Sequence, residues 1–192
     1  APCGFAKPAS PENVAACVHA AIDLGITAID TAPAYDIGEE GVGRGLGQRR
    51  QQVFLSTKVM ADTIADAEKS FSNSLKVLKT DYVDLLCLGW WSDTPPKRIV
   101  EMALGLKESG KVRHVMVSCH HRPSFPSLIV DDRFEAIMVR YNAAHPGAER
   151  DVFPHLHHRK PAVVAYTATS LRKLLSPPRG WDGPTMTAGD CY

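Results

Sequence analysis

Three residues in the N-terminal part of the chain have side chains suited to proton transfer. Asp30 and Tyr35 follow one short apolar segment, and Lys58 lies at the end of the next. An ammonium group lowers the pKa of a nearby phenol, and a carboxylate holds that ammonium in place. We therefore interpret the three as a candidate proton-transfer unit. Taken singly, they also fit a helix-capping Asp, a loop Tyr and a surface Lys.

The elements that must position these residues alternate regularly between helix and strand. The expected strands are residues 26–30, 53–58, 83–88, 112–118, 136–141 and 162–166. The expected helices run from Ser10 to Gly25, over 39–46 and 64–78, from Pro95 to Gly110, and over 124–130 and 151–156. Apolar, non-alternating strands separated by helices predict a parallel sheet covered by helices.

Polar residues gather at the C-terminal ends of these strands, namely Asp30, Lys58, Ser118, Asn142 and Thr167. This suits a site built on strand-to-helix loops, in a closed (β/α)8 barrel or in an open doubly wound sheet. A glycine cluster at 41–47 lies inside a helix candidate and does not directly follow a strand. It is either a phosphate loop or, as we favour, a surface for close helix packing.

The composition of the chain restricts the classes of protein and partner that need to be considered. The 192 residues carry a net charge of +1, which gives no electrostatic reason to expect nucleic acid or membrane as a partner. The sequence shows neither an apolar run of membrane-spanning length nor a signal peptide at its start. The five cysteines are scattered, so we expect reduced thiols in a cytoplasmic protein, with Cys17 and Cys87 on apolar faces.

Several motifs, in the right order along nearly the whole chain, resemble the aldo-keto reductase family. They are Asp30-Thr31-Ala32-Pro33-Ala34-Tyr35 with Gly38-Glu39 and Gly43-Arg44-Gly45-Leu46, then Ser56-Thr57-Lys58-Val59, the passage 74–85, Gly110-Lys111-Val112-Arg113, Tyr141-Asn142 and Ala165-Tyr166-Thr167. The resemblance implies an α/β fold, a TIM barrel that binds NADPH and reduces a small aldehyde or ketone. It makes Tyr35 the general acid, with Lys58 lowering its pKa and Asp30 fixing Lys58.

The resemblance also implies a cofactor site. Ser118 would contact the nicotinamide carboxamide, Thr167, Ala168 and Thr169 would lie around the pyrophosphate, and Tyr166 would lie near the cofactor. The family's catalytic His position holds Gly89, and its Asn and Gln positions in this site hold Cys119 and Met138. A full barrel takes about 250 residues. We therefore expect residues 1–192 to form a single, partial barrel domain, with an incomplete first strand and no eighth strand.

The remaining chemistry-bearing residues have two interpretations each. Trp90 and Trp91 line a substrate pocket or pack under a loop, and His120 or His121 replaces the missing His or lies in a solvated loop. His155, His157 and His158 invite zinc, but no carboxylate or Cys accompanies them at ligand spacing, so we expect no metal. Two other functions stay open: a catalytically impaired, cofactor-binding regulator, and a lyase or isomerase using Lys58 as a base or Schiff-base amine.

Overall fold

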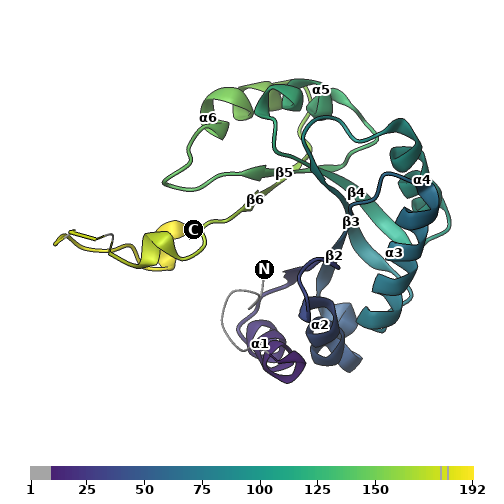
Figure 1. Ribbon diagram of the computed structural model, residues 1–192, viewed down its shortest axis with the longest axis horizontal. Helices are drawn as coiled ribbons and strands as arrows, with labels where there is room; N and C mark the ends of the chain where they lie inside the picture. Colours follow the sequence, from purple (N-terminus) through teal and green to yellow (C-terminus); the bar gives the residue numbers. More distant parts are fainter. Residues whose placement is uncertain (1–9, 178, 181) are drawn as a thin grey trace. The chain divides into compact units, whose positions relative to one another are not determined.

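The computed structural model describes residues 10–177, 179–180 and 182–192. Its helices are α1 Pro11–Asp23, α2 Gly38–Leu46, α3 Ile64–Leu78, α4 Lys97–Glu108, α5 Phe125–Val130 and α6 Ala148–Asp151 (Figure 1). Its strands are β1 Ala28–Asp30, β2 Phe54–Val59, β3 Val83–Trp91, β4 Val112–Cys119, β5 Ala136–Arg140 and β6 Ala162–Tyr166. Each expected strand is present, with ends shifted by at most three residues.

The six strands follow one another in the sheet in the order of the sequence, β1 to β6. β1 with β2, β2 with β3 and β5 with β6 are parallel. Consecutive parallel strands require a crossover in each connection, which here contains a helix or a 3-10 turn. The predicted α/β class is confirmed.

The chain divides into two compact units. The first unit comprises the chain up to Gly89 together with Pro95–Met116, and the second comprises Trp90–Thr94 and Val117–Tyr192. The first unit therefore holds α1 to α4, β1, β2 and most of β3 and β4. The second holds α5, α6, β5 and β6. The single domain expected over 1–192 stays a prediction.

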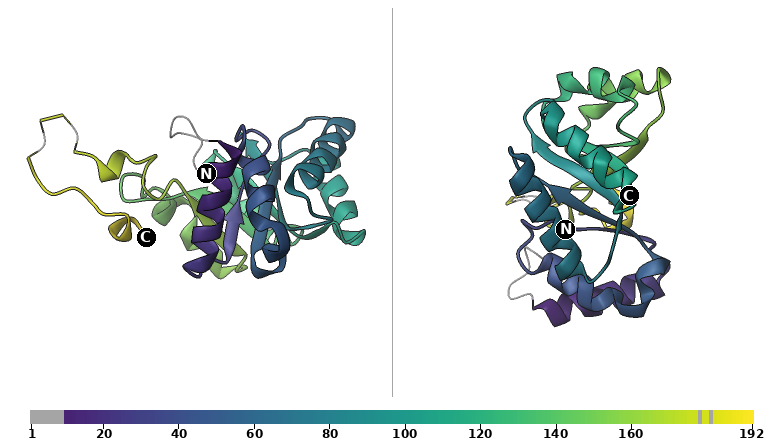
Figure 2. Two further views of the ribbon diagram at one scale, coloured as in Figure 1. Left: turned by 90° about the horizontal axis from the view of Figure 1, so that it is seen from below. Right: turned by 90° about the vertical axis from the view of Figure 1, so that its right-hand side faces the viewer.

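The glycines of α2 are a packing surface in the first unit. A Cβ atom on Gly41 would collide with the Val14 side chain of α1, and one on Gly43 would collide with the backbone of Val77 and Leu78 in α3. A Cβ on Gly45 would lie 2.7 Å from Val18 Cβ. α1 and α2 accordingly lie side by side (Figures 1 and 2). Close helix packing, rather than a phosphate loop, explains Gly41, Gly43 and Gly45.

Local signals explain where the helices of the first unit begin. Ser10 caps α1, its Oγ accepting a hydrogen bond from the Asn13 N–H at 3.2 Å, and Thr63 caps α3 in the same way. One face of α3 is buried, and it includes Phe71 and Leu78. Ile64, the first residue of the helix, is exposed.

Two expectations about single segments are wrong. Cys17 is exposed, whereas Cys87 in β3 is buried as expected. The helix expected over 151–156 is in fact α6, which ends at Asp151, followed by a 3-10 helix at Phe153–His157. Pro154 lacks an N–H and cannot continue an α-helix in its interior, so the chain tightens into the 3-10 form there.

Candidate active site

The ends of β1 and β2 bring Asp30 and Lys58 together. Lys58 Nζ lies 2.5 Å from both carboxylate oxygens of Asp30 and 3.3 Å from the carbonyl oxygen of Thr31. The Lys58 side chain is only 1% exposed, while that of Asp30 is 35% exposed. A buried ammonium must be paired to stay charged, and the bidentate contact with Asp30 provides that pairing.

The pKa of Lys58 reflects two opposing effects. Burial acts to lower it, but attraction by Asp30, with smaller contributions from Cys87 and Tyr35, outweighs burial and raises the pKa above its ordinary value. Lys58 is therefore an ammonium at neutral pH. Cys87 is its neighbour across β2 and β3, and burial raises the pKa of that thiol to about 12, so it remains uncharged.

Tyr35 lies on the loop between β1 and α2, near the same ammonium. Lys58 Nζ is 5.4 Å from the centroid of the Tyr35 ring. Burial raises the pKa of Tyr35, Lys58 lowers it and Asp30 raises it, and the net shift is upward. The expected lowering by Lys58 is thus present as one contribution but does not dominate. The phenol keeps its proton at neutral pH.

The loop that carries Tyr35 is short and internally bonded. The Tyr35 N–H donates to the carbonyl oxygen of Ala32 at 3.0 Å, and the Gly38 N–H donates to that of Tyr35 at 2.8 Å. Gly38 begins α2, and a Cβ there would lie 3.0 Å from Tyr35 Cβ. The first turn of α2 and the backbone of Tyr35 are thus in direct contact.

Gly89, near the end of β3, leaves space beside Lys58. A Cβ at this position would lie 3.7 Å from Lys58 Cδ and 3.7 Å from Met60 Cγ, both ordinary van der Waals distances. Its φ lies outside the left-handed region. Neither the backbone conformation nor the packing requires glycine at this position. The absence of a side chain at Gly89 therefore affects which chemical groups face Lys58, and not the fold.

The residues expected to hold a cofactor belong to the second unit. Ser118 and Cys119 end β4, and Met138 lies in β5; all three are buried. The Cys119 thiol donates to the carbonyl oxygen of His121 at 3.5 Å. Burial raises the pKa of Cys119, which keeps it a thiol.

The loop after β6 contains Thr167, Ala168 and Thr169. Thr167 has φ +60°, and Asn142 Nδ2 donates to its carbonyl oxygen at 2.8 Å. Asn142 is buried and holds this loop, whereas the sequence identified it as a polar strand end and as part of a family-like motif. Tyr166, the last residue of β6, is half-buried, and its ring lies edge-on to His120 at 6.4 Å between centroids.

The remaining pocket candidates are also in the second unit. Nε1 of Trp91 is buried without a hydrogen-bond partner among the described residues. His121 Nδ1 lies 3.0 Å from Ser124 Oγ, and Ser124 donates to Asp93, so His121 is tied to its own loop. The side chain of Trp90 lies outside the described part of the structure.

Comparison with known proteins decides the family. The sequence model of the aldo/keto reductase family matches residues 4–174. The chain belongs to the aldo/keto reductase family. The predicted resemblance is confirmed, and with it the (β/α)8 type of fold, since solved members of the family superpose on most of the chain.

Similar proteins include reductases from several bacteria. The chain is 32% identical to aldo-keto reductase YhdN of Bacillus subtilis over 164 residues, covering 78% of this chain and 50% of that protein. It is 33% identical to methylglyoxal reductase DkgA of Yersinia pestis over 144 residues, covering 72% and 51%. The chain therefore spans about half the length of these curated relatives.

Solved aldo-keto reductases give the structural counterpart. An enzyme from Klebsiella pneumoniae in complex with NADP and acetate matches with a TM-score of 0.77 and 30% identity, covering 86% of this chain and 62% of that one. The holo form of an enzyme from Bacillus halodurans matches with a TM-score of 0.80 and 26% identity, covering 93% and 64%.

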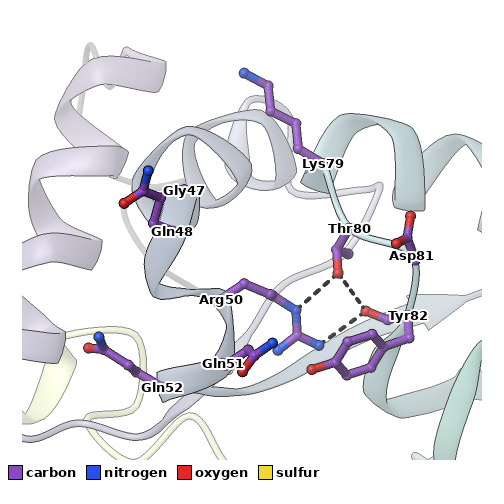
Figure 3. A pocket seen from close by; sticks show the side chains of 9 residues that line it. All are labelled: Gly47, Gln48, Arg50, Gln51, Gln52, Lys79, Thr80, Asp81 and Tyr82. Carbon is purple, nitrogen blue, oxygen red and sulfur yellow. Dashed lines mark hydrogen bonds between the residues drawn. The ribbon is translucent and has the colours of Figure 1, made fainter.

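A polar hollow of about 600 Å³, whose lining side chains are drawn in Figure 3, lies beside the residues that precede β2 and β3. Its walls include Arg50, Lys79, Thr80 and Tyr82. The guanidinium of Arg50 bonds Thr80 Oγ1, the carbonyl oxygen of Tyr82 and the carboxylate of Asp84. Because the N–H groups of its guanidinium donate to other residues of the chain, Arg50 has a structural role and does not serve as a ligand for an anion.

The described residues contain no group of three or more His, Cys, Asp or Glu side chains arranged to hold a metal ion. His157 and His158 lie ring against ring with centroids 3.8 Å apart, and His157 contacts the carbonyl oxygen of Pro154. In the part of the chain described, no helix has both the length and the apolar character to cross a membrane.

Proposed function

We propose that this site reduces an aldehyde or ketone to an alcohol with NADPH, and that Tyr35 donates the proton. The observation that carries the proposal is the buried ammonium of Lys58, held 2.5 Å from Asp30 and 5.4 Å from the Tyr35 ring centroid. Family membership and the NADP-bound solved relative support it.

The side chains of the second unit fit a nicotinamide cofactor in part. Ser118 offers a buried hydroxyl, and Tyr166 offers a half-buried aromatic face. The loop after β6 turns on residues of positive φ, a conformation in which backbone N–H groups can converge on an anion. Cys119 and Met138 supply only weakly polar sulfur atoms, so we assign the binding to Ser118, Tyr166 and residues 167–169.

Each catalytic residue has one task in the proposed reaction. Bound NADPH would supply the hydride to the carbonyl carbon. Tyr35 donates its phenolic proton to the carbonyl oxygen, and its raised pKa keeps that proton available at neutral pH. Lys58 stabilises the phenolate that remains, Asp30 holds Lys58 in place, and the phenolate takes a proton back from water.

The names of similar proteins and the open space at Gly89 indicate the class of substrate that we propose. Several relatives are named methylglyoxal reductases, so we infer a small carbonyl compound as the substrate. The space beside Lys58 that Gly89 leaves open suits substrate or water in place of a side chain.

A second candidate function is a cofactor-binding protein with impaired chemistry, which Gly89 favours because the side chain that would orient the carbonyl is missing. A Schiff-base role for Lys58 is disfavoured, because an ammonium with a raised pKa, bonded to a carboxylate, is not a nucleophile. Failure of borohydride to trap substrate on Lys58 would remove that role.

The test is NADPH oxidation with a panel of aromatic and aliphatic aldehydes that includes methylglyoxal. We expect Tyr35→Phe to lower kcat by about 100-fold or more while NADPH binding is retained. Tyr141→Phe is the matched control, since Tyr141 bonds Glu149 on the exposed surface of the second unit. Turnover that survives in Tyr35→Phe would exclude Tyr35 as the acid, and NADPH binding without any turnover would favour the second function.

A further inference from the structure

Glu39 is a buried carboxyl group with no part in the proton transfer described above. It is 4% exposed and lies in the first turn of α2. Its Oε1 accepts a hydrogen bond of 2.6 Å from Thr57 Oγ1, and Thr57 is fully buried in β2. Burial raises the pKa of Glu39, while the bond from Thr57 acts to lower it.

The two bonded residues are direct chain neighbours of the catalytic ones. Thr57 precedes Lys58 on β2, and Glu39 follows Gly38, whose N–H bonds the Tyr35 carbonyl oxygen. Successive side chains of a strand point to opposite faces of the sheet. Thr57 therefore faces α2 while Lys58 faces Asp30, so one rigid strand connects the two contacts.

We propose that Glu39 and Thr57 are positioning residues, which fix α2 and the Tyr35 loop against β2 and so set the separation of the Tyr35 phenol from the Lys58 ammonium. The effect on turnover rests on the function proposed above. The effect on the phenol itself does not, because it is measured without substrate.

The separation matters because Lys58 is the group that lowers the pKa of Tyr35. The other charged or titratable groups acting on Tyr35 are Asp30 on β1 and Cys87 on β3, and both raise that pKa. Moving the loop away from β2 weakens the attraction of Lys58 and leaves burial and Asp30 to raise the pKa further. A displacement of about 1 Å in a catalytic group can reduce the rate by about 100-fold.

The chain offers matched variants for the test. Thr57→Val removes the hydroxyl at nearly constant volume, and Thr57→Ala removes it with a smaller side chain should the valine variant fail to fold. Thr57→Ser keeps the hydroxyl. Thr80→Val removes a threonine hydroxyl that bonds Arg50 and Tyr82 at the other end of the sheet, so it controls for the loss of a hydroxyl that does not bond α2.

The readouts are titration of the Tyr35 phenol, assigned by difference against the Tyr35→Phe protein, and separate kcat and KM values. Thr57→Val is expected to raise the pKa of Tyr35 by about half a unit or more. It is expected to lower kcat by about tenfold with little change in KM. Thr57→Ser and Thr80→Val should resemble the wild type in both.

An unchanged Tyr35 titration in a folded Thr57→Val or Thr57→Ala protein would overturn the proposal, and so would an equal shift in Thr80→Val. Absence of turnover in every protein, including the wild type, would count against the reductase function alone. The phenol titration would still decide whether Glu39 and Thr57 position Tyr35.

Discussion

At the scale of single residues, the candidate site brings an acidic, a basic and a phenolic side chain together beside a glycine. The buried Lys58 ammonium forms a bidentate ion pair with the partly exposed Asp30 carboxylate, and Tyr35 lies close to the ammonium. Gly89 lies against the aliphatic part of the same lysine, where a Cβ would fit. The residue that we propose as the proton donor and the charged groups beside it are thus present, whereas Gly89 offers no side chain that could orient a carbonyl group.

Restoring a side chain at Gly89 should therefore increase activity. We expect Gly89→His to raise kcat/KM for small aldehydes by about tenfold or more, because an imidazole can orient and polarise the carbonyl oxygen. The measurement is steady-state NADPH oxidation. Gly89→Ala is the control, as it fills the same Cβ position without an imidazole. Equal activities of the His and Ala variants would mean that the space, not the imidazole, controls turnover.

At the scale of elements, α2 determines how close the Tyr35 loop comes to the sheet. Its glycines let α1 and α3 approach its backbone, and Glu39 bonds it to β2. The glycines for which the sequence favoured close helix packing over a phosphate loop thus form a packing surface on the helix that follows Tyr35.

Adding a methyl group to this surface should destabilise the protein. A Cβ at Gly43 would lie 2.8 Å from the Cα of Leu78, and backbone atoms cannot move aside cheaply. We expect Gly43→Ala to lower the free energy of unfolding by about 2 kcal/mol. Urea denaturation followed by circular dichroism measures it. Gly105→Ala in α4 is the control: no atom lies within 4 Å of its Cβ position, so it should gain about 0.5 kcal/mol. If Gly43→Ala did not lower the free energy of unfolding relative to Gly105→Ala, this account of α2 would be contradicted.

At the scale of the whole molecule, the chain consists of two compact units, and an ionic cluster around the buried Asp84 carboxylate joins three strands of the first. The Asp84 carboxylate accepts from Arg50 at 2.8 Å, Arg113 at 3.0 Å and the Leu55 N–H at 2.9 Å. Both guanidinium groups also lie over the ring of Tyr82. The cluster lies at the N-terminal ends of β2, β3 and β4, whereas Lys58 lies toward the C-terminal end of β2.

Removing Asp84 should leave the buried Arg50 guanidinium without its charge partner. We expect Asp84→Ala to reduce the free energy of unfolding by about 3 kcal/mol, within the range for breaking a buried ion pair. Thermal unfolding of the variant beside Asp81→Ala measures this. Asp81 is an exposed carboxylate lining the same hollow, and its loss should change stability by less than about 0.5 kcal/mol. Similar melting temperatures for the two variants would show that the cluster contributes little.

The sequence by itself determined the order and type of the elements and the identity of Asp30, Tyr35 and Lys58 as candidates. Buried parallel strands are continuous apolar runs, and Ser10 and Gly25 mark helix ends, so both can be recognised locally. The roles of these residues and of the cofactor positions in the second unit remain predictions.

Only the tertiary structure decided which polar residues form hydrogen bonds with one another and which neighbouring helix each glycine of α2 contacts. Glu39 and Thr57 are 18 positions apart in the chain and have ordinary neighbours, so no local pattern indicates their hydrogen bond. The upward shift in the pKa of Tyr35 likewise depends on burial competing with Lys58 and Asp30, and sequence spacing does not reveal burial. Contacts between distant segments, and the desolvation that accompanies them, exist only once the chain has folded.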